Sequence, residues 1–138
     1  MHGYAAAAIA RDPSVLSILV VDDEPDMRLL IRAILEAAGM HVVGEAADAQ
    51  EALEMFRELN PPPVPSLILL DNRMPGPSGL TVAAQILADV PDQPIVLFSA
   101  FLDEQIQAEA AELGVARCVS KTDVTRLPQI IKAITVSR

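Results

Sequence analysis

The fold of this chain is decided by the stretch Ile18-Leu-Val-Val-Asp-Asp23, in which four apolar residues run directly into two acidic ones. A continuous apolar run is typical of a parallel strand buried on both faces, whereas a strand with one solvated face alternates apolar and polar residues. Four further short, mainly apolar segments are interpreted in the same way: Val42-Val43 with its neighbours, Leu67–Leu70, Ile95–Phe98 and Ala116–Val119. The five runs predict five strands of one parallel sheet.

Helical periodicity lies between these runs. Apolar residues recur at the spacing of a single helix face, and Gly39 ends the first such segment. Asp48 is placed to cap the second helix with Glu51 as its capping-box partner, Ser78 to cap the third, and Pro128 fits the first turn of the fifth. The apolar positions of the five predicted helices are Met27, Leu30, Ile31, Ile34, Leu35 and Ala38; Ala49, Ala52, Leu53 and Phe56; Leu80, Ala83, Ala84 and Leu87; Leu102, Ile106, Ala110 and Leu113; Leu127, Ile130, Ile131 and Ile134.

Strands alternating with helices predict a doubly wound α/β domain with a five-stranded parallel sheet, five helices and right-handed crossovers. A length of 138 residues suits one such domain. We expect a mobile tail at residues 1–16, the domain at 17–138, and a stiff proline-rich loop at 60–65.

Composition excludes several classes of function. The net charge of −9 repels nucleic-acid phosphates, so direct nucleic-acid binding is disfavoured. The single cysteine forms no internal disulfide. The apolar runs are too short to cross a membrane, and the first residues lack the features of a signal peptide. We therefore expect a soluble, cytoplasmic protein.

The predicted chemistry lies where the strands end. In a parallel sheet the carboxyl ends of the strands meet at one edge, which here gathers Asp22, Asp23, Asp71, Ser99 and Lys121. Clustered carboxylates repel one another unless a cation enters, and a few hard oxygen ligands suit Mg²⁺ (or Mn²⁺). A metal beside an ammonium and a hydroxyl stabilises a phosphoryl group during transfer, and a carboxylate there can be the nucleophile.

Four motifs follow one another along the chain: Val20-Val-Asp-Asp-Glu-Pro25, Leu69-Leu-Asp-Asn-Arg-Met-Pro75 with Gly79, Ser99-Ala100 and Ser120-Lys121. In this order they resemble the receiver domain of two-component response regulators, the CheY-like family with a flavodoxin-like fold. The resemblance runs from about residue 17 to about residue 135, and the combination of motifs is highly specific.

The resemblance implies a role for each residue. Asp71 would accept a phosphoryl group from a sensor histidine kinase or a phosphotransfer protein. Asp23 would bind the metal directly and Asp22 through water, while Asp71 and the backbone carbonyl of Arg73 would complete the protein ligands. Lys121 would pair with the phosphoryl oxygens.

The resemblance also implies a switch. Ser99 would move to hydrogen-bond the phosphoryl group and so alter the face formed by the helix at 102–113, the strand at 116–119 and the helix at 127–134. A downstream protein would bind this face, and dimerisation through it is left open. Such a domain promotes its own phosphorylation and dephosphorylation but is not a separate class of enzyme.

Two positions depart from the family pattern. Cys118 stands where many receivers carry a switch aromatic, and Thr122 follows the lysine where proline is usual. A phosphorylation-independent docking module, a pseudo-receiver, is therefore the main alternative. An aspartyl phosphatase of the haloacid-dehalogenase type would need a second acid at position 73, which is Arg73, and a flavodoxin-like cofactor binder would need a Ser/Thr/Gly-rich loop in place of the acidic pair. We expect a receiver without an output domain in this chain, either a stand-alone regulator or the truncated N-terminal receiver of a larger one.

Overall fold

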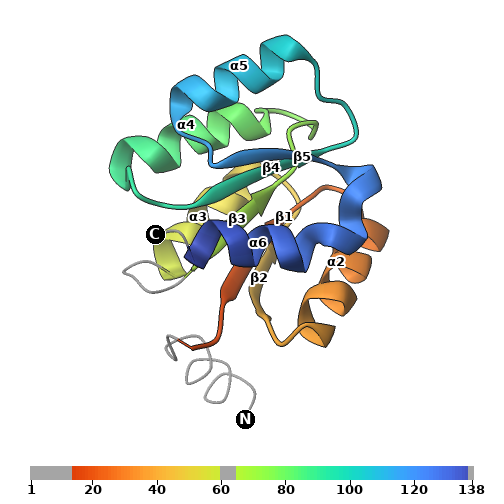
Figure 1. The fold of residues 1–138 in the computed structure, drawn as a ribbon. Helices are drawn as coiled ribbons and strands as arrows, with labels where there is room; N and C mark the ends of the chain where they lie inside the picture. The colour runs from red at the N-terminus through yellow and green to blue at the C-terminus, as the bar shows by residue number, and fades with distance from the viewer. Residues whose placement is uncertain (1–13, 60–64, 137–138) are drawn as a thin grey trace.

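The computed structural model describes residues 14–59 and 65–136, which form one sheet with helices on both faces (Figure 1). The tail expected at 1–16 lies outside the described residues except for its last three, and the loop expected at 60–65 does so except for Pro65. The strands are β1 (Ser17–Val21), β2 (His41–Ala46), β3 (Leu67–Leu70), β4 (Ile95–Ser99) and β5 (Arg117–Ser120). The helices are α2 (Pro25–Ala37), α3 (Ala49–Leu59), α4 (Gly79–Asp89), α5 (Glu104–Leu113) and α6 (Leu127–Val136), with a 3₁₀ helix, η1 (Lys121–Arg126), before α6.

All strand pairs are parallel and the strand order is β2-β1-β3-β4-β5. The predicted fold class is therefore confirmed. The order reverses at β1 and β3, because the chain moves outward from β1 to β2 and then returns past β1 to build the other half. The carboxyl ends of these two adjacent strands carry Asp22 and Asp71.

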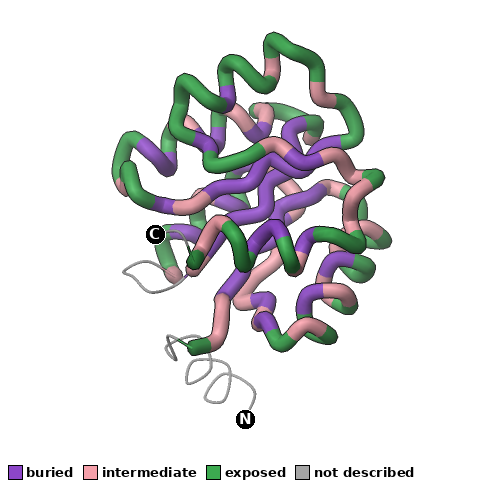
Figure 2. Tube along the Cα trace, in the orientation of Figure 1, coloured by how far each residue is buried: buried purple, intermediate pink, exposed green. Residues whose placement is uncertain are grey.

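Two cores sandwich the sheet, and successive residues of each central strand point into opposite ones. Ile18 and Val20 pack with α2 and α6, while Leu19 and Val21 pack with α3, α4 and α5. Figure 2 shows the resulting buried centre, in which β1, β3 and β4 are buried throughout and β2 and β5 only in part. The apolar runs were continuous because these three strands have helices on both sides.

Helix boundaries follow the predicted caps. Asp48 accepts a hydrogen bond from the Glu51 N–H at 2.9 Å, and the Glu51 carboxylate accepts one from the Ala47 N–H, one residue before the partner that a capping box prescribes. Ser78 accepts from the Thr81 N–H at 3.2 Å. Pro128 lies in the first turn of α6, where its missing N–H leaves no hydrogen bond unmade.

Three details of the helices correct the expectations. Leu30 was placed in the buried stripe of α2, but it is 44% exposed because Ile31 and Leu35 take the inward positions. Leu102 precedes α5, which Asp103 caps by accepting from the Ile106 N–H. The 3₁₀ helix η1 had no expected counterpart. Among the described residues no helix is long and apolar enough to cross a membrane.

The loop after β3 is joined tightly to the start of α4. The carbonyl oxygen of Asn72 accepts from the Gly79 N–H and its side chain accepts from the Leu80 N–H, both at 3.0 Å. A Cβ at Gly79 would overlap the backbone carbonyl oxygen of Asp71 and lie 2.9 Å from the Asn72 Cα. Glycine is therefore required at position 79, because the backbone of Asp71 and Asn72 leaves no room for a Cβ. This close approach holds the start of α4 against the loop that follows β3.

We expect Gly79→Ala to lower the free energy of unfolding by about 2 kcal/mol or more, since the obstructing atoms are backbone and cannot rotate away. Urea unfolding followed by circular dichroism measures the change. Gly76→Ala is the matched control: its φ of +80° is unfavourable for alanine, but no atom of residues 14–59 or 65–136 outside its immediate chain neighbours lies within 4 Å of the added Cβ, so it costs about 1 kcal/mol. Equal losses in the two variants would contradict the packing argument.

Candidate functional site

Four strand ends bring the predicted residues to one edge of the sheet. Asp22 follows β1, Asp71 follows β3, Ser99 ends β4 and Lys121 follows β5. Ser99 pairs in register with Ser120, so Lys121 starts one residue beyond the end of β4. The strand register, which is set by the two cores, therefore delivers these side chains to one place.

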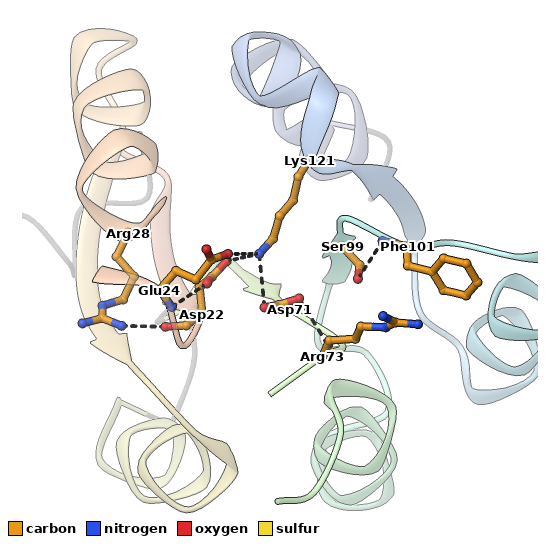
Figure 3. Close-up of polar contacts among 8 residues, drawn as sticks. All are labelled: Asp22, Glu24, Arg28, Asp71, Arg73, Ser99, Phe101 and Lys121. Atoms are coloured by element: carbon orange, nitrogen blue, oxygen red, sulfur yellow. Dashed lines mark hydrogen bonds and ion pairs between the residues drawn. The ribbon is translucent and has the colours of Figure 1, made fainter. Parts of the chain in front are cut away.

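The Lys121 ammonium is the centre of this cluster (Figure 3). Its Nζ lies 2.8 Å from Asp22 Oδ2, 3.2 Å from Asp71 Oδ2 and 3.2 Å from Glu24 Oε1. The Lys121 side chain is 10% exposed, and those of Asp22 and Asp71 are almost fully buried. Lys121 therefore contacts Asp22 and Asp71 even though Thr122, rather than the proline of the family pattern, follows it.

Asp22 is held by several groups. Its Oδ1 accepts a hydrogen bond from the Glu24 N–H at 2.9 Å, and its backbone carbonyl accepts one from Arg28 Nη1 at 2.6 Å. Its buried Oδ2 has the ion-pair contact with Lys121 but, within the part of the chain that the structure describes, no hydrogen bond of regular geometry. This oxygen therefore keeps capacity for a cation.

Carboxylate oxygens of Asp22, Asp23 and Asp71 lie within 4.8 Å of one another, with Asp23 half-buried and the other two buried. A set of hard anionic oxygens with one incompletely satisfied member fits a small divalent cation such as Mg²⁺, which retains waters to complete its shell. The residues present therefore fit the predicted metal.

Burial and neighbouring charges shift the pKa values of Asp71 and Lys121. Burial, reinforced by the nearby charge of Asp22, raises the pKa of Asp71 to about 6 despite the opposing effect of Lys121. Burial lowers the pKa of Lys121, but its contacts with Asp22, Asp71 and Glu24 outweigh burial and raise that pKa overall. Lys121 therefore stays protonated, whereas ionisation of the Asp71 carboxyl is less favourable here than in water.

The remaining predicted residues surround Asp71. The Arg73 N–H donates to Asp71 Oδ1 at 3.3 Å, and the Arg73 guanidinium lies 4.5 Å from the centre of the Phe101 ring. The hydroxyl of the fully buried Ser99 accepts a long hydrogen bond of 3.5 Å from the Phe101 N–H. Arg73 and Phe101 thus form an exposed pair beside the acidic cluster (Figure 3).

Cys118 lies away from this cluster, on β5. Its half-buried thiol packs against the core shared with α4 and α5, and burial raises its pKa. It therefore contributes as a small apolar side chain, as a strand cysteine is expected to. Ser120 Oγ accepts from the Thr122 N–H at 3.3 Å and forms a hydrogen bond with the Thr122 hydroxyl at 2.9 Å, which steadies the start of η1.

Sequence reasoning missed three contributors. Glu24, which was not among the predicted site residues, contacts Lys121 from the N-cap position of α2. Asn72 ties the loop after β3 to α4, and Arg28 holds the Asp22 backbone. Only an asparagine directly after the candidate nucleophile, and an arginine in the second turn after the acidic pair, could have signalled the last two.

A comparison with known protein families identifies the family to which this chain belongs. The sequence profile of the response regulator receiver domain matches residues 18–133. The chain belongs to this family. Receiver domains are phosphoacceptor modules of two-component signal transduction rather than enzymes in the ordinary sense, and they generally bind Mg²⁺ through an acidic cluster.

Individual members of the family are similar to this chain in sequence and in structure. Chemotaxis protein CheY of Thermotoga maritima is 32% identical over 97 residues, which are 70% of this chain and 78% of that protein. Protein CcdB of Bacillus subtilis is 37% identical over 97 residues, with the same two shares. The crystal structure of a two-component response regulator of the LuxR family from an Aurantimonas species has a TM-score of 0.82 at 32% identity, covering 90% of this chain and 87% of that one.

We expect Asp71→Asn to stabilise the metal-free protein at pH 8 and to leave its stability at pH 4 almost unchanged. Because the folded pKa of about 6 lies above the ordinary value of 3.8, the folded protein binds this proton more tightly than the unfolded chain does. Ionisation of Asp71 therefore lowers the free energy of unfolding above pH 6. Below pH 4 it has no such effect, because the carboxyl is protonated in both the folded and the unfolded states. We expect a gain of about 1–3 kcal/mol.

Urea unfolding in EDTA at several pH values measures this gain. Asp92→Asn, in an exposed turn, is the control and shifts stability by less than about 0.5 kcal/mol at either pH. A loss of stability on Asp71→Asn at pH 8, or a gain independent of pH, would show that Lys121 outweighs burial at this carboxylate.

Proposed function

We propose that this chain is a phosphoacceptor switch in which Asp71 receives a phosphoryl group from a histidine kinase or a phosphotransfer protein. The observation that carries the proposal is the buried Asp71 carboxylate, 3.2 Å from the Lys121 ammonium and grouped with Asp22 and Asp23. This arrangement supplies a nucleophile, a cation for the incoming anion and a set of metal ligands in one place.

The chemistry follows from these positions. An Asp71 oxygen attacks the phosphorus of a phosphohistidine, forming an O–P bond while the P–N bond breaks. The electron pair leaves with the imidazole nitrogen, which takes up a proton. Asp71 is the carboxylate suited to attack because its raised pKa reports a more basic oxygen. The Asp22 carboxylate instead accepts a hydrogen bond from the Glu24 N–H, and the Asp22 backbone carbonyl accepts one from Arg28.

Lys121 has the second role. Its ammonium is shared among Asp22, Asp71 and Glu24 before transfer, and the phosphoryl oxygens then offer it a stronger partner. Mg²⁺, held by Asp23, by Asp71, by the carbonyl of Arg73 and through water by Asp22, would neutralise charge on the transferring phosphoryl group. Mn²⁺ would serve in its place.

The same proposal includes the switch. The hydrogen bond that Ser99 accepts from the Phe101 N–H is long, at 3.5 Å, so its hydroxyl exchanges a weak partner for phosphoryl oxygens. That movement acts on the face of α5, β5 and α6. Cys118 pairs in register with Leu97 on β4, and as a small thiol it transmits the change through packing rather than by the rotation of a ring.

Partners follow from the chemistry. The phosphodonor is a histidine kinase or phosphotransfer protein, and a downstream protein reads the face of α5, β5 and α6, which also serves any homodimer. A cytoplasmic location belongs to the proposal because a kinase draws on nucleoside triphosphate. Direct nucleic-acid contact by this domain is not part of it, since the chain carries a net charge of −9.

We expect acetyl phosphate to add one phosphoryl group to the protein in the presence of Mg²⁺ but not in EDTA, because charge neutralisation is needed at the acidic site. Intact-mass spectrometry measures the addition. Asp71→Asn abolishes it, whereas the control Asp92→Asn retains it. Addition to Asp71→Asn would place the acceptor elsewhere, and no addition under any condition would favour the pseudo-receiver.

We expect Lys121→Met to slow phosphoryl addition by roughly 100-fold, in line with the loss of one charged group that stabilises a transition state. The same change tightens the binding of Mn²⁺, because it removes a positive charge from among three carboxylates. Titration calorimetry with Mn²⁺ and the rate of mass gain measure the two effects. Weaker Mn²⁺ binding in this variant would mean that Lys121 organises the carboxylates rather than serving the phosphoryl group.

A further inference from the structure

We propose that Arg28 is the positioning residue of the metal-binding acidic pair: it fixes the peptide that joins Asp22 to Asp23 and couples that peptide to β2. This inference rests on the proposed function, because it assumes that the acidic pair binds a divalent cation. Arg28 itself touches neither the cation nor the phosphoryl group.

Arg28 lies in the second turn of α2 and reaches back to the strand end. Its Nη1 donates to the Asp22 carbonyl oxygen at 2.6 Å, while its Nε lies 3.3 Å from Glu45 Oε1 (Figure 3 shows the first of these contacts). The Arg28 side chain is 19% exposed. A guanidinium presents several donors in a rigid plane, so one side chain holds both groups in a fixed relation.

Glu45 is itself anchored. Its Oε2 accepts from the Nε of Arg32 at 2.8 Å, and Arg32 also pairs with Glu36 one turn along α2. Glu45 therefore joins two arginines of α2 to β2, and Arg28 is the member of this network that extends it to the acidic pair.

The Asp22 backbone is consequently gripped at both ends by adjacent residues of β2. Its N–H donates to the Ala46 carbonyl at 3.0 Å, and its carbonyl is held through Arg28 to Glu45. The two peptide planes that flank the Asp22 Cα are therefore both held, and the second of them leads directly into Asp23, which is expected to bind the metal directly. The mutual repulsion of the carboxylates would otherwise drive this loop apart.

Two effects of Arg28 on cation binding have opposite signs, which makes the inference testable. As a nearby positive charge, Arg28 weakens cation binding, so its removal alone would tighten it. As a positioning residue it strengthens binding, and loss of such outer contacts typically costs 10–100-fold in metal affinity. We infer that positioning dominates, because Arg28 contacts the ligand-bearing backbone directly and its charge is already paired with Glu45.

The test is Mn²⁺ affinity, measured by the loss of free-ion signal in electron paramagnetic resonance, on wild type, Arg28→Met, Arg28→Lys, Arg32→Met and Asp71→Asn. Arg32→Met is the matched control because it removes the same charge from the same helix and the same partner, Glu45, but no contact to Asp22. Urea unfolding in EDTA reports the stability of each variant independently of the metal.

We expect Mn²⁺ binding to weaken by 10-fold or more in Arg28→Met and by about threefold in Arg28→Lys, which keeps the charge but not the rigid pair of donors. Arg32→Met stays within twofold of wild type even where it loses as much stability. Should Arg28→Met not fold, Arg28→Lys carries the same test.

Unchanged or tighter binding in the Arg28 variants would overturn the inference and leave the proposed function intact, provided wild type binds Mn²⁺ and Asp71→Asn weakens that binding. Equal weakening in Arg32→Met would also overturn it, because metal affinity would then follow stability alone. A wild type that binds no Mn²⁺ would overturn both the metal part of the proposed function and this inference.

Discussion

The site depends on one ammonium shared by three carboxylates. Lys121 is 2.8 Å from Asp22 and 3.2 Å from both Asp71 and Glu24, and two of these carboxylates are almost fully buried. Without a positive charge at this point, burial of Asp22 and Asp71 side by side would be strongly unfavourable. Lys121 therefore lets the fold hold an acidic cluster of the kind that the proposed function requires.

The surrounding structure keeps this arrangement in place from three directions. The strand register brings Asp71 beside Asp22, Gly79 and Asn72 fix the loop after Asp71 against α4, and Arg28 ties the Asp22 backbone to Glu45 on β2. Each of these supports acts on backbone rather than on the reacting oxygens. The oxygens thus remain available to a ligand while their positions are set by rigid elements.

The two departures from the family pattern fall on the side of the site nearest β5. Thr122 does not prevent Lys121 from reaching Asp22 and Asp71, because the Ser120 hydroxyl accepts from the Thr122 N–H and steadies the turn. Cys118 packs as a small half-buried side chain next to the core under α4 and α5. The contacts of Lys121 with Asp22 and Asp71 are therefore retained, and under the proposed function the two altered residues bear on how a change at Ser99 reaches the outer face.

The sequence alone determined the sheet, its helices and the edge where the polar residues gather, because continuous apolar runs such as Leu67–Leu70 and helical spacing are local properties that survive without knowledge of contacts. It also identified Asp22, Asp23, Asp71, Ser99 and Lys121 as residues that share that edge. Only the tertiary structure decided which groups pair there: Glu24 with Lys121, Arg28 with the Asp22 carbonyl, and Asn72 with the start of α4. These contacts depend on the spacing of α2, α4 and β5 around the strand ends, and long side chains reach across that spacing in ways that no periodicity records.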